Sequence, residues 1–289
     1  MTAAITVRDY SWRYLHAASE ALTQVTLTID EGVFLGVIGP NGSGKTTLAY
    51  SLNGLIPGQY RGIKAGSVHV YDREVETYGH GELQRTIGVV FSDPEAQFTA
   101  MTVEDELVFG LENLGLSLAE IRERLQWVVD LVNLGPLLNK PPYEISGGQK
   151  QRVALAAVLA MKPRILVLDE PTSMLDPISR RRVFDVLNDL KQARSNTVIV
   201  IEHSLENLVP LADRMALLSG GRLVLEDETP AFFKQMDTLL AHGITPPGAL
   251  RYFHALQQSG VDGGAPPLTL EAAATRLRAL LDGQTERRS

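Results

Sequence analysis

A glycine-rich run with one lysine is the segment of this sequence whose residue types and spacing point most directly to chemistry. It reads Gly39, Pro40, Asn41, Gly42, Ser43, Gly44, Lys45 and Thr46, with Thr47 next, between an apolar predicted strand and a predicted helix. Glycines let a backbone turn tightly and aim its N–H groups inward, and a helix N-terminus adds a positive end. The run is predicted to cradle phosphates, with Lys45 reaching the β- and γ-phosphates and the Thr46 hydroxyl ligating Mg²⁺.

A plain glycine-rich turn is the competing interpretation of this run. At an average glycine frequency of about 7%, the full pattern arises by chance in roughly one chain of this length in a hundred. The flanking strand and helix are the context in which the pattern binds phosphate, so they favour that interpretation.

Two carboxylates follow a second apolar run, residues 165–168. A Mg-nucleotide site uses such a strand end to hold its metal and to orient water. Asp169 is the candidate metal ligand, directly or through water, and Glu170 is the candidate general base for the attacking water. Taken alone, a strand that ends in Asp-Glu is more often a capped turn.

A third polar pair, Glu202 and His203, follows the apolar run 198–201. Alone, His203 would more often be a surface residue at a strand end. The runs 33–38, 165–168 and 198–201 are nearly continuous in apolar residues, as expected for parallel strands covered on both faces. Ligands of parallel sheets bind at the carboxyl ends of the strands, so the three polar groups are predicted to meet there.

Other segments are expected to surround this sheet. Residues 5–7 and 25–29 read as partly exposed antiparallel strands, because apolar and polar side chains alternate in the second. Residues 102–134 read as a helical insertion, since residues 102 and 105, and then 117 and 120, have the spacing of capping boxes. Its predicted apolar face consists of Leu118, Ile121, Leu125, Val129 and Val132.

The later part of the chain is expected to return to strands and to end in helices. Asp176 and Pro177 predict a helix that ends near residue 190, and Gly220 with Gly221 predicts a hairpin. From about residue 229 we expect a separate tail, with helices near 248–259 and 269–282 and a Gly/Pro-rich linker between them.

Composition limits the classes of function. The 289 residues are 44% hydrophobic, as in a folded protein, and the net charge of -7 argues against a protein that coats nucleic acid. The absence of cysteine excludes disulfides, zinc thiolate sites and cysteine nucleophiles, and it fits a reducing compartment. No apolar run is long enough to span a bilayer and the first thirty residues lack a secretory signal, so we expect a cytoplasmic protein, and something else must anchor it if it serves a membrane.

A second anion site is predicted where Ser146, Gly147, Gly148 and Gln149 open an apolar helix. One chain needs only one phosphate loop, and residues 145–152 closely resemble the signature motif of ABC ATPases. The resemblance covers roughly residues 3–228 and includes the family's motifs in order. These are Walker A at 39–46, the signature at 146–149, Walker B at 165–170, the D-loop at 173–176 and the switch histidine, His203.

The resemblance implies a fold and a set of ligands. The fold is an α/β P-loop NTPase with a mostly parallel core sheet, an N-terminal antiparallel β-subdomain, a helical insertion carrying the signature motif and a small C-terminal helical tail. The expected domains are an ABC ATPase domain over residues 1–228, with its helical subdomain at about 95–160, and a C-terminal extension over 229–289. The ligands are ATP and Mg²⁺.

In the family, two ATPase subunits sandwich two ATP molecules head to tail. By this resemblance, Ser146, Gly147 and Gly148 would contact the γ-phosphate bound to the lysine of the partner subunit. His203 would touch the γ-phosphate and sense it.

An aromatic ring that stacks on adenine is also implied. Tyr14 occupies the family's position, although Tyr10 and Trp12 lie close enough to be rivals. Simple packing within the sheet is an open alternative for Tyr14.

One position departs from the family pattern. After residues 87–91 the family has a glutamine that meets Mg²⁺ and the transmembrane partner, whereas this chain has Ser92, with Gln97 five residues on. Ser92 is shorter and could reach the metal only through water. Either Gln97 substitutes for the missing glutamine, or the site is weaker than the norm.

Residues 93–115, 171–177 and 242–247 look like the ATPase subunits of energy-coupling-factor importers. Those transporters take up vitamins or cobalt and nickel ions, and their two ATPase subunits dock on a membrane coupling protein beside a substrate-binding membrane subunit. The resemblance implies a peripheral protein at the cytoplasmic face of the membrane, paired with a copy of itself or a paralogue.

Three alternatives stay open in part. An exporter ATPase is the nearest, because many exporters also use separate ATPase chains. A weakly active regulatory subunit is motivated only by Ser92. An ABC ATPase of DNA repair or translation is disfavoured by the single Walker A motif and the continuous cassette.

Overall fold

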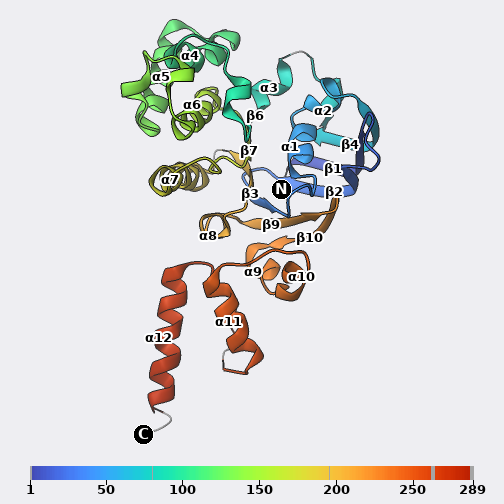
Figure 1. Ribbon diagram of the computed structural model, residues 1–289, viewed down its shortest axis with the longest axis vertical. Helices are drawn as coiled ribbons and strands as arrows, with labels where there is room; N and C mark the ends of the chain where they lie inside the picture. Colours follow the sequence, from blue (N-terminus) through green and yellow to red (C-terminus); the bar gives the residue numbers. More distant parts are fainter. Residues whose placement is uncertain (1, 80, 195, 262–263, 287–289) are drawn as a thin grey trace.

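The structure, a computed structural model, describes residues 2–79, 81–194, 196–261 and 264–286. A six-stranded sheet lies at its centre, with a helical region at one end and the C-terminal helices at the other (Figure 1). In spatial order its strands are β10 (Arg222–Glu228), β9 (Arg214–Ser219), β3 (Phe34–Ile38), β8 (Thr197–Ile201), β7 (Ile165–Asp169) and β6 (Ile87–Val90). Only the β9–β10 hairpin is antiparallel, which confirms the mostly parallel core sheet.

The sheet is buried on both faces because β3, β6, β7 and β8 are apolar along most of their length, with Thr197 and Asp169 at strand ends as the polar exceptions. Leu35 and Val37 face one hydrophobic core, whereas Phe34 and Ile38 of the same strand face the other. Successive side chains of a strand point to opposite faces, so a strand without polar positions can pack against two layers.

The first of these layers is the N-terminal antiparallel sheet. It consists of β2 (Leu22–Asp30), β1 (Ala3–Tyr14), β4 (Gly62–Val70) and β5 (Arg73–Glu74), in that spatial order. The predicted alternation is confirmed, since Val25, Leu27 and Ile29 are buried and the threonines between them are exposed. Between the two sheets lies helix α1 (Lys45–Leu52), and α2 (Leu55–Gly58), η1 (Val75–Thr77) and α3 (Glu82–Thr86) follow in the connections.

The predicted helical insertion forms a subdomain at one end of the core sheet. It contains η2 (Pro94–Gln97), α4 (Val103–Asn113), α5 (Leu118–Leu131), η3 (Gly135–Leu137), η4 (Pro142–Glu144) and α6 (Gly147–Ala160). Ser117 and Glu120 form a reciprocal capping box, and the Thr102 hydroxyl accepts from the backbone N–H of Asp105.

The prediction that Leu118 belongs to the buried apolar face of α5 is wrong. Leu118 is 72% exposed, whereas Ile121, Val129 and Val132 are buried. Leu118 is the first residue of α5, and a helical side chain leans toward the helix N-terminus. Its side chain therefore projects beyond the surface that the rest of α5 packs against.

On the same face of the sheet, α7 (Pro177–Ala193) starts at Asp176, as predicted, and the short α8 (Leu205–Leu208) follows β8. The carboxylate of Asp176 accepts from the backbone N–H groups of Ile178 and Ser179, both at 3.0 Å. This cap fixes where the loop after β7 ends.

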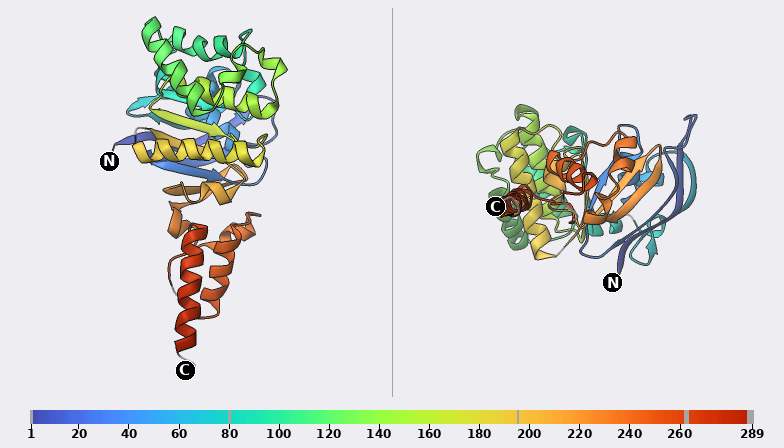
Figure 2. Two further views of the ribbon diagram at one scale, coloured as in Figure 1. Left: turned by 90° about the vertical axis from the view of Figure 1, so that its left-hand side faces the viewer. Right: turned by 90° about the horizontal axis from the view of Figure 1, so that it is seen from below.

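The C-terminal residues form α9 (Thr229–Phe232), α10 (Met236–Ala241), α11 (Gly248–Gln258) and α12 (Leu270–Glu286). Phe232, Phe233, Met236 and Leu239 are buried in the main core, so α9 and α10 pack against the body that contains the core sheet. Helices α11 and α12 project away from it, side by side (Figure 2). No helix within the described residues is both long and apolar enough to cross a membrane.

Candidate active site

The glycine-rich loop connects the end of β3 to the start of α1, as predicted. At Gly44 the backbone has a φ of 100°, and a Cβ there would meet the carbonyl oxygen of Ala21. A Cβ at Gly39 would meet the carbonyl oxygen of Leu218, at the end of β9. Both positions therefore require glycine, because no side chain fits where the loop passes its neighbouring strands.

Lys45 is folded back onto its own loop. Its Nζ donates to the carbonyl oxygens of Gly39 and Pro40, at 2.9 and 3.0 Å, and the side chain is buried. Burial lowers the pKa of Lys45, while the nearby carboxylates of Glu170 and Asp169 raise it in part. A buried cation beside two carboxylates and a loop of backbone N–H groups suits a polyphosphate.

Asp169 ends β7 next to this loop. It is buried, and neither carboxylate oxygen completes a hydrogen bond of normal geometry with the described residues. Burial raises the pKa of Asp169, although the Thr46 hydroxyl and Lys45 lie near enough to oppose the shift. An unpartnered buried carboxylate is costly unless a cation joins it.

These residues fit a Mg²⁺ ion held together with a nucleotide. Mg²⁺ is usually bound by one or two carboxylates plus substrate phosphates and waters rather than by an all-protein cage. Accordingly, the described residues contain no group of three or more carboxylate, histidine or cysteine side chains that could enclose a metal. Asp169 and Thr46 are the residues that could hold the ion beside the phosphates.

Glu170 and His203 meet across two neighbouring strands. The carboxylate Oε1 of Glu170 lies 2.9 Å from Nε2 of His203, and both side chains are partly exposed. Glu170 has a φ of 51°, a left-handed conformation that costs a non-glycine residue on the order of 1–3 kcal/mol. This sharp turn directs the carboxylate away from the strand and toward the next loop.

Tyr14 lies at the end of β1 beside helix α1. Its hydroxyl is 3.2 Å from Oγ1 of Thr47, and its ring is half-buried, edge-on to Trp12 and Tyr60. Tyr10 and Trp12 are each 1% exposed and belong to the core between the sheets. Among the three aromatic candidates, Tyr14 is therefore the one that is partly exposed and whose hydroxyl contacts the helix that follows the loop.

Ser146 caps helix α6 through a second reciprocal capping box, with Gln149. Ser146 and Gly147 are exposed, and a Cβ on Gly148 would touch Leu175 of the loop that follows β7. Among the described residues, no hydrogen bond joins this segment to Lys45 or to the other residues of the cluster. The structure does not bring the two predicted anion sites together within one chain.

The two candidate substitutes for the expected glutamine are separated. Ser92 follows β6 and is half-buried. Gln97 ends η2 and lines a groove in the helical subdomain, where its Nε2 is buried without a hydrogen-bond partner among the described residues. Within that part of the chain, no hydrogen bond joins either residue to Thr46 or Asp169.

Two features beside the site were not predicted from the sequence. Residues 243–245 of the tail line a cavity of about 370 Å³ together with the phosphate loop, Glu202 and His203. The adjacent His242 is held by a contact of 3.1 Å between its Nδ1 and Oγ of Ser219. Contacts between residues so far apart in the chain leave no local pattern in the sequence from which they could be predicted. Glu202 alone has a local signal, because it is a carboxylate directly after an apolar strand.

Comparison with known proteins decides the family. A family model described as ABC transporter matches residues 22–173. The chain belongs to the ABC transporter family. The predicted fold class and the predicted class of ATPase are confirmed with it.

Similarity to individual proteins extends beyond residues 22–173, which the family model matches. The energy-coupling factor transporter ATP-binding protein EcfA1 of Bacillus subtilis is 40% identical over 258 residues, which are 89% of this chain and 90% of that protein. The structure of CbiO1 from Clostridium perfringens, described as part of the ABC transporter complex CbiONQ, covers 89% of this chain and 100% of that chain. Its TM-score is 0.69 at 26% identity.

A third relative is a dimeric ATP-binding cassette in a post-hydrolysis state, bound to ADP and phosphate. It matches with a TM-score of 0.69 and 26% identity, and it covers 78% of this chain and 98% of that chain. The dimeric cassette therefore covers a smaller share of this chain than CbiO1 does.

Proposed function

We propose that this chain is the ATP-hydrolysing subunit of an energy-coupling-factor-type importer and acts as one half of a nucleotide-binding dimer. The observation that carries the proposal is the convergence of Lys45, Asp169, Glu170 and His203 at the carboxyl edge of the core sheet. The similarity to EcfA1 and CbiO1 supports the importer class.

The residues of the site divide the chemistry of hydrolysis among them. Glu170 is the group that would accept a proton from water as the water attacks the γ-phosphorus, because its carboxylate is partly exposed beside the loop. His203, at 2.9 Å from that carboxylate, would orient it and contact the γ-phosphate. When bound, Mg²⁺ supplies charge neutralisation on the phosphates, and Asp169 and Thr46 would hold it.

Binding of ATP requires Lys45 to change partners. Its ammonium group now donates to two carbonyl oxygens of the loop, at the centre of the place that phosphates would take. Phosphate oxygens carry charge and accept stronger hydrogen bonds than neutral carbonyl oxygens. Lys45 is therefore expected to turn from its loop toward the β- and γ-phosphates when ATP binds.

A second ATPase subunit would complete each site. Ser146 and Gly147 are exposed at the N-terminus of α6, and the first turn of this helix contains no acidic residue. A γ-phosphate held by the partner subunit suits that position, because free N–H groups and the helix dipole favour negative charge. The partner is a second copy of this chain or a paralogue, and Tyr14 would stack on adenine.

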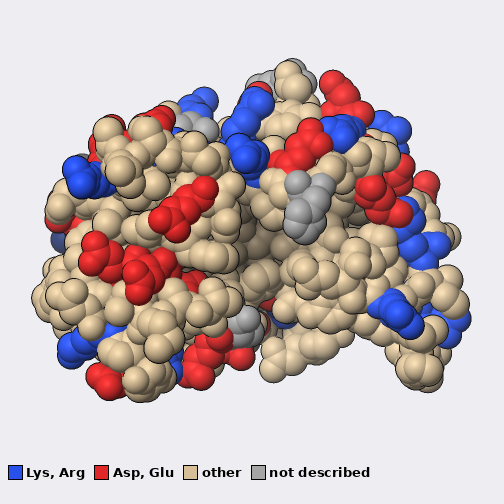
Figure 3. All heavy atoms as spheres, turned by 90° about the horizontal axis from the view of Figure 1, so that it is seen from above, with Lys and Arg blue, Asp and Glu red and all other residues tan. Residues whose placement is uncertain are grey.

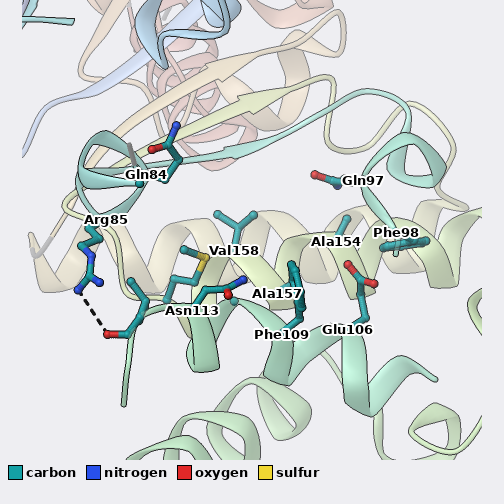
Figure 4. A pocket seen from close by; sticks show the side chains of 14 residues that line it. Gln84, Arg85, Gln97, Phe98, Glu106, Phe109, Asn113, Ala154, Ala157 and Val158 are labelled. Atoms are coloured by element: carbon teal, nitrogen blue, oxygen red, sulfur yellow. Dashed lines mark hydrogen bonds between the residues drawn. The ribbon is translucent and has the colours of Figure 1, made fainter. Parts of the chain in front are cut away.

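The membrane partner would dock in a groove of about 670 Å³ between α3 and the helices α4 and α6. A hollow separates two lobes in the view from above, and most side chains that face it are uncharged (Figure 3). Gln97, Phe109 and Val158 line the groove from three elements (Figure 4). Phe109 is 51% exposed there, so it is available to an apolar partner such as a helix of the coupling protein.

The proposed cargo, location and coupling motion follow from the proposed class of importer. The cargo would be a vitamin or a transition-metal ion, bound by a separate membrane subunit that this chain need not touch. The chain would lie peripherally at the cytoplasmic face of the membrane. Closure of the ATPase dimer on ATP, and its reopening after hydrolysis, would drive the coupling protein through the groove.

The test is to extract the chain from its native membrane in mild detergent and to identify the proteins that co-purify. We expect a coupling protein and a small substrate-binding membrane subunit. Phe109→Asp should reduce the recovered coupling protein by about tenfold or more, since burying an unpaired carboxylate in the interface is costly. A soluble particle without a membrane partner would contradict the importer proposal.

A matched control uses another exposed apolar side chain of the helical subdomain. Leu118→Asp places the same charge on α5, outside the groove, at a residue that is 72% exposed. This variant should recover the coupling protein as well as the unmodified chain. Equal recovery with Phe109→Asp and Leu118→Asp would mean that the groove is not the docking site.

A further inference from the structure

Glu202 is a buried carboxylate that the proposed hydrolysis does not use directly. It follows β8 and is 3% exposed. Its Oε1 accepts from the hydroxyl of Thr172, and its Oε2 accepts from the backbone N–H groups of His203 and Ser204, at 3.1 and 3.5 Å. A buried carboxylate with these donors is satisfied without a cation.

These contacts close a ring between two loops. Strands β7 and β8 are neighbours, with Asp169 opposite Ile201, so the loops that follow them leave the sheet side by side. Glu170 contacts His203, and Thr172 contacts Glu202. Two residues of the first loop are thus joined to two adjacent residues of the second, and His203 is held both at its ring and at its backbone.

The burial of Glu202 and its hydrogen bonds argue against two other roles. A general base must reach the attacking water and a metal ligand must reach the ion, whereas Glu202 is 3% exposed and both of its oxygens accept hydrogen bonds from the protein. Glu170, by contrast, has a side chain that is 27% exposed. Glu202 therefore acts on the reaction only through what it holds.

We propose that Glu202 is a positioning residue for His203, and that Thr172 positions Glu202 in turn. This inference rests on the proposed function, because it assigns Glu202 to the hydrolysis that Glu170 and His203 carry out. The backbone of His203 is fixed by the buried carboxylate, which leaves the imidazole pointing at Glu170 and at the place of the γ-phosphate. Without Glu202, the exposed contact to Glu170 alone orients the ring.

The test compares Glu202→Ala with Glu202→Gln in the native membrane complex of the full chain. Glu202→Ala should lower kcat for ATP hydrolysis by about 10- to 100-fold, as expected for a small displacement of a catalytic group. The KM for ATP should stay unchanged, since the phosphate loop is intact. Glu202→Gln should restore most of kcat, because the amide oxygen accepts from the same backbone N–H groups and the Thr172 hydroxyl can turn to accept from the amide nitrogen.

A second experiment, in a chain that already carries His203→Ala, separates a positioning role of Glu202 from a merely structural one. In a His203→Ala chain, the further change Glu202→Ala should lower kcat no more, because the group that it positions is absent. An equal additional loss in that background would overturn the inference, and so would wild-type kcat in Glu202→Ala. If Glu202→Ala does not fold, Thr172→Val and Thr172→Ser replace the pair, with loss expected for valine and rescue for serine.

The unmodified complex in the same assay keeps this inference distinct from the proposed function. If the unmodified complex hydrolyses ATP and Glu202→Ala matches it, only the positioning role is wrong. If the unmodified complex does not hydrolyse ATP, the proposed function itself is wrong.

Discussion

Asp169 shows at the scale of a single residue how the site is prepared for a ligand. Its carboxylate is buried with no hydrogen bond of normal geometry to the described residues, and burial raises its pKa. Without a bound cation this arrangement destabilises the folded chain, because a buried charge needs a partner. The residue is placed for binding at some expense of stability.

Replacing Asp169 by asparagine should separate these two effects. Because the pKa of Asp169 is raised on folding, its contribution to stability is fully present below the ordinary value of 3.8 and is lost as the pH rises through the raised value. At neutral pH, Asp169→Asn should therefore raise the melting temperature of the ligand-free chain, by about 2–4 °C for each kcal/mol recovered. The added stability that Mg²⁺ and ATP give together should disappear.

Thermal unfolding with and without Mg-ATP, measured at several pH values, checks both parts. Asp169→Asn should also weaken the fall in stability with rising pH. A lower melting temperature of the ligand-free variant, or an undiminished shift with Mg-ATP, would contradict this account of Asp169.

At the scale of the element, α5 and α6 begin with the same device. Ser117 with Glu120, and Ser146 with Gln149, form reciprocal capping boxes. Only the second is assigned a ligand, so the pair offers a matched comparison. Aspartate caps helices as well as serine does, and it adds a negative charge.

Ser146→Asp should leave α6 intact and strongly lower the rate of hydrolysis. A charge there would face the γ-phosphate held by the partner subunit, and like charges ~4 Å apart repel by about 4 kcal/mol at an effective dielectric near 20. The rate should fall by about 100-fold or more, whereas Ser117→Asp should leave it unchanged. Equal rates for both variants, at equal melting temperatures, would mean that Ser146 only caps its helix.

The sequence predicted the main elements because their signals are local. Continuous apolar runs identified β3, β7 and β8, and capping residues located the starts of α5 and α7. Helices α9 and α10 were missed because they span four and six residues, too short for a periodic pattern. Their buried phenylalanines are held by the fold rather than by helix propensity.

The candidate site was predictable to the same extent. Residues at strand ends were found because parallel strands bring their carboxyl ends to one edge. Contacts across the fold were not, since the hydrogen bond between Thr172 and Glu202 joins residues 30 positions apart. The cavity wall formed by residues 243–245 depends in the same way on how α10 packs.

At the scale of the whole molecule, the chain presents two half-sites on different elements. One holds the phosphate loop with Glu170 and His203, and the other is the exposed start of α6. The groove that Gln97 and Phe109 line lies between α3 and the helical subdomain that contains α6. A partner in the groove would therefore be attached to the element that would contact the second nucleotide, and closure on ATP would then have a direct route to the membrane.

ATP hydrolysis by the native membrane complex, with and without Glu170→Gln, tests the central claim most directly. Glutamine keeps the size of the side chain and its contact with His203, but it cannot accept a proton from water. We predict that the unmodified complex hydrolyses ATP and that Glu170→Gln lowers the rate by about 100- to 10,000-fold while ATP still binds. Full hydrolysis by the Glu170→Gln complex would contradict the role of this site.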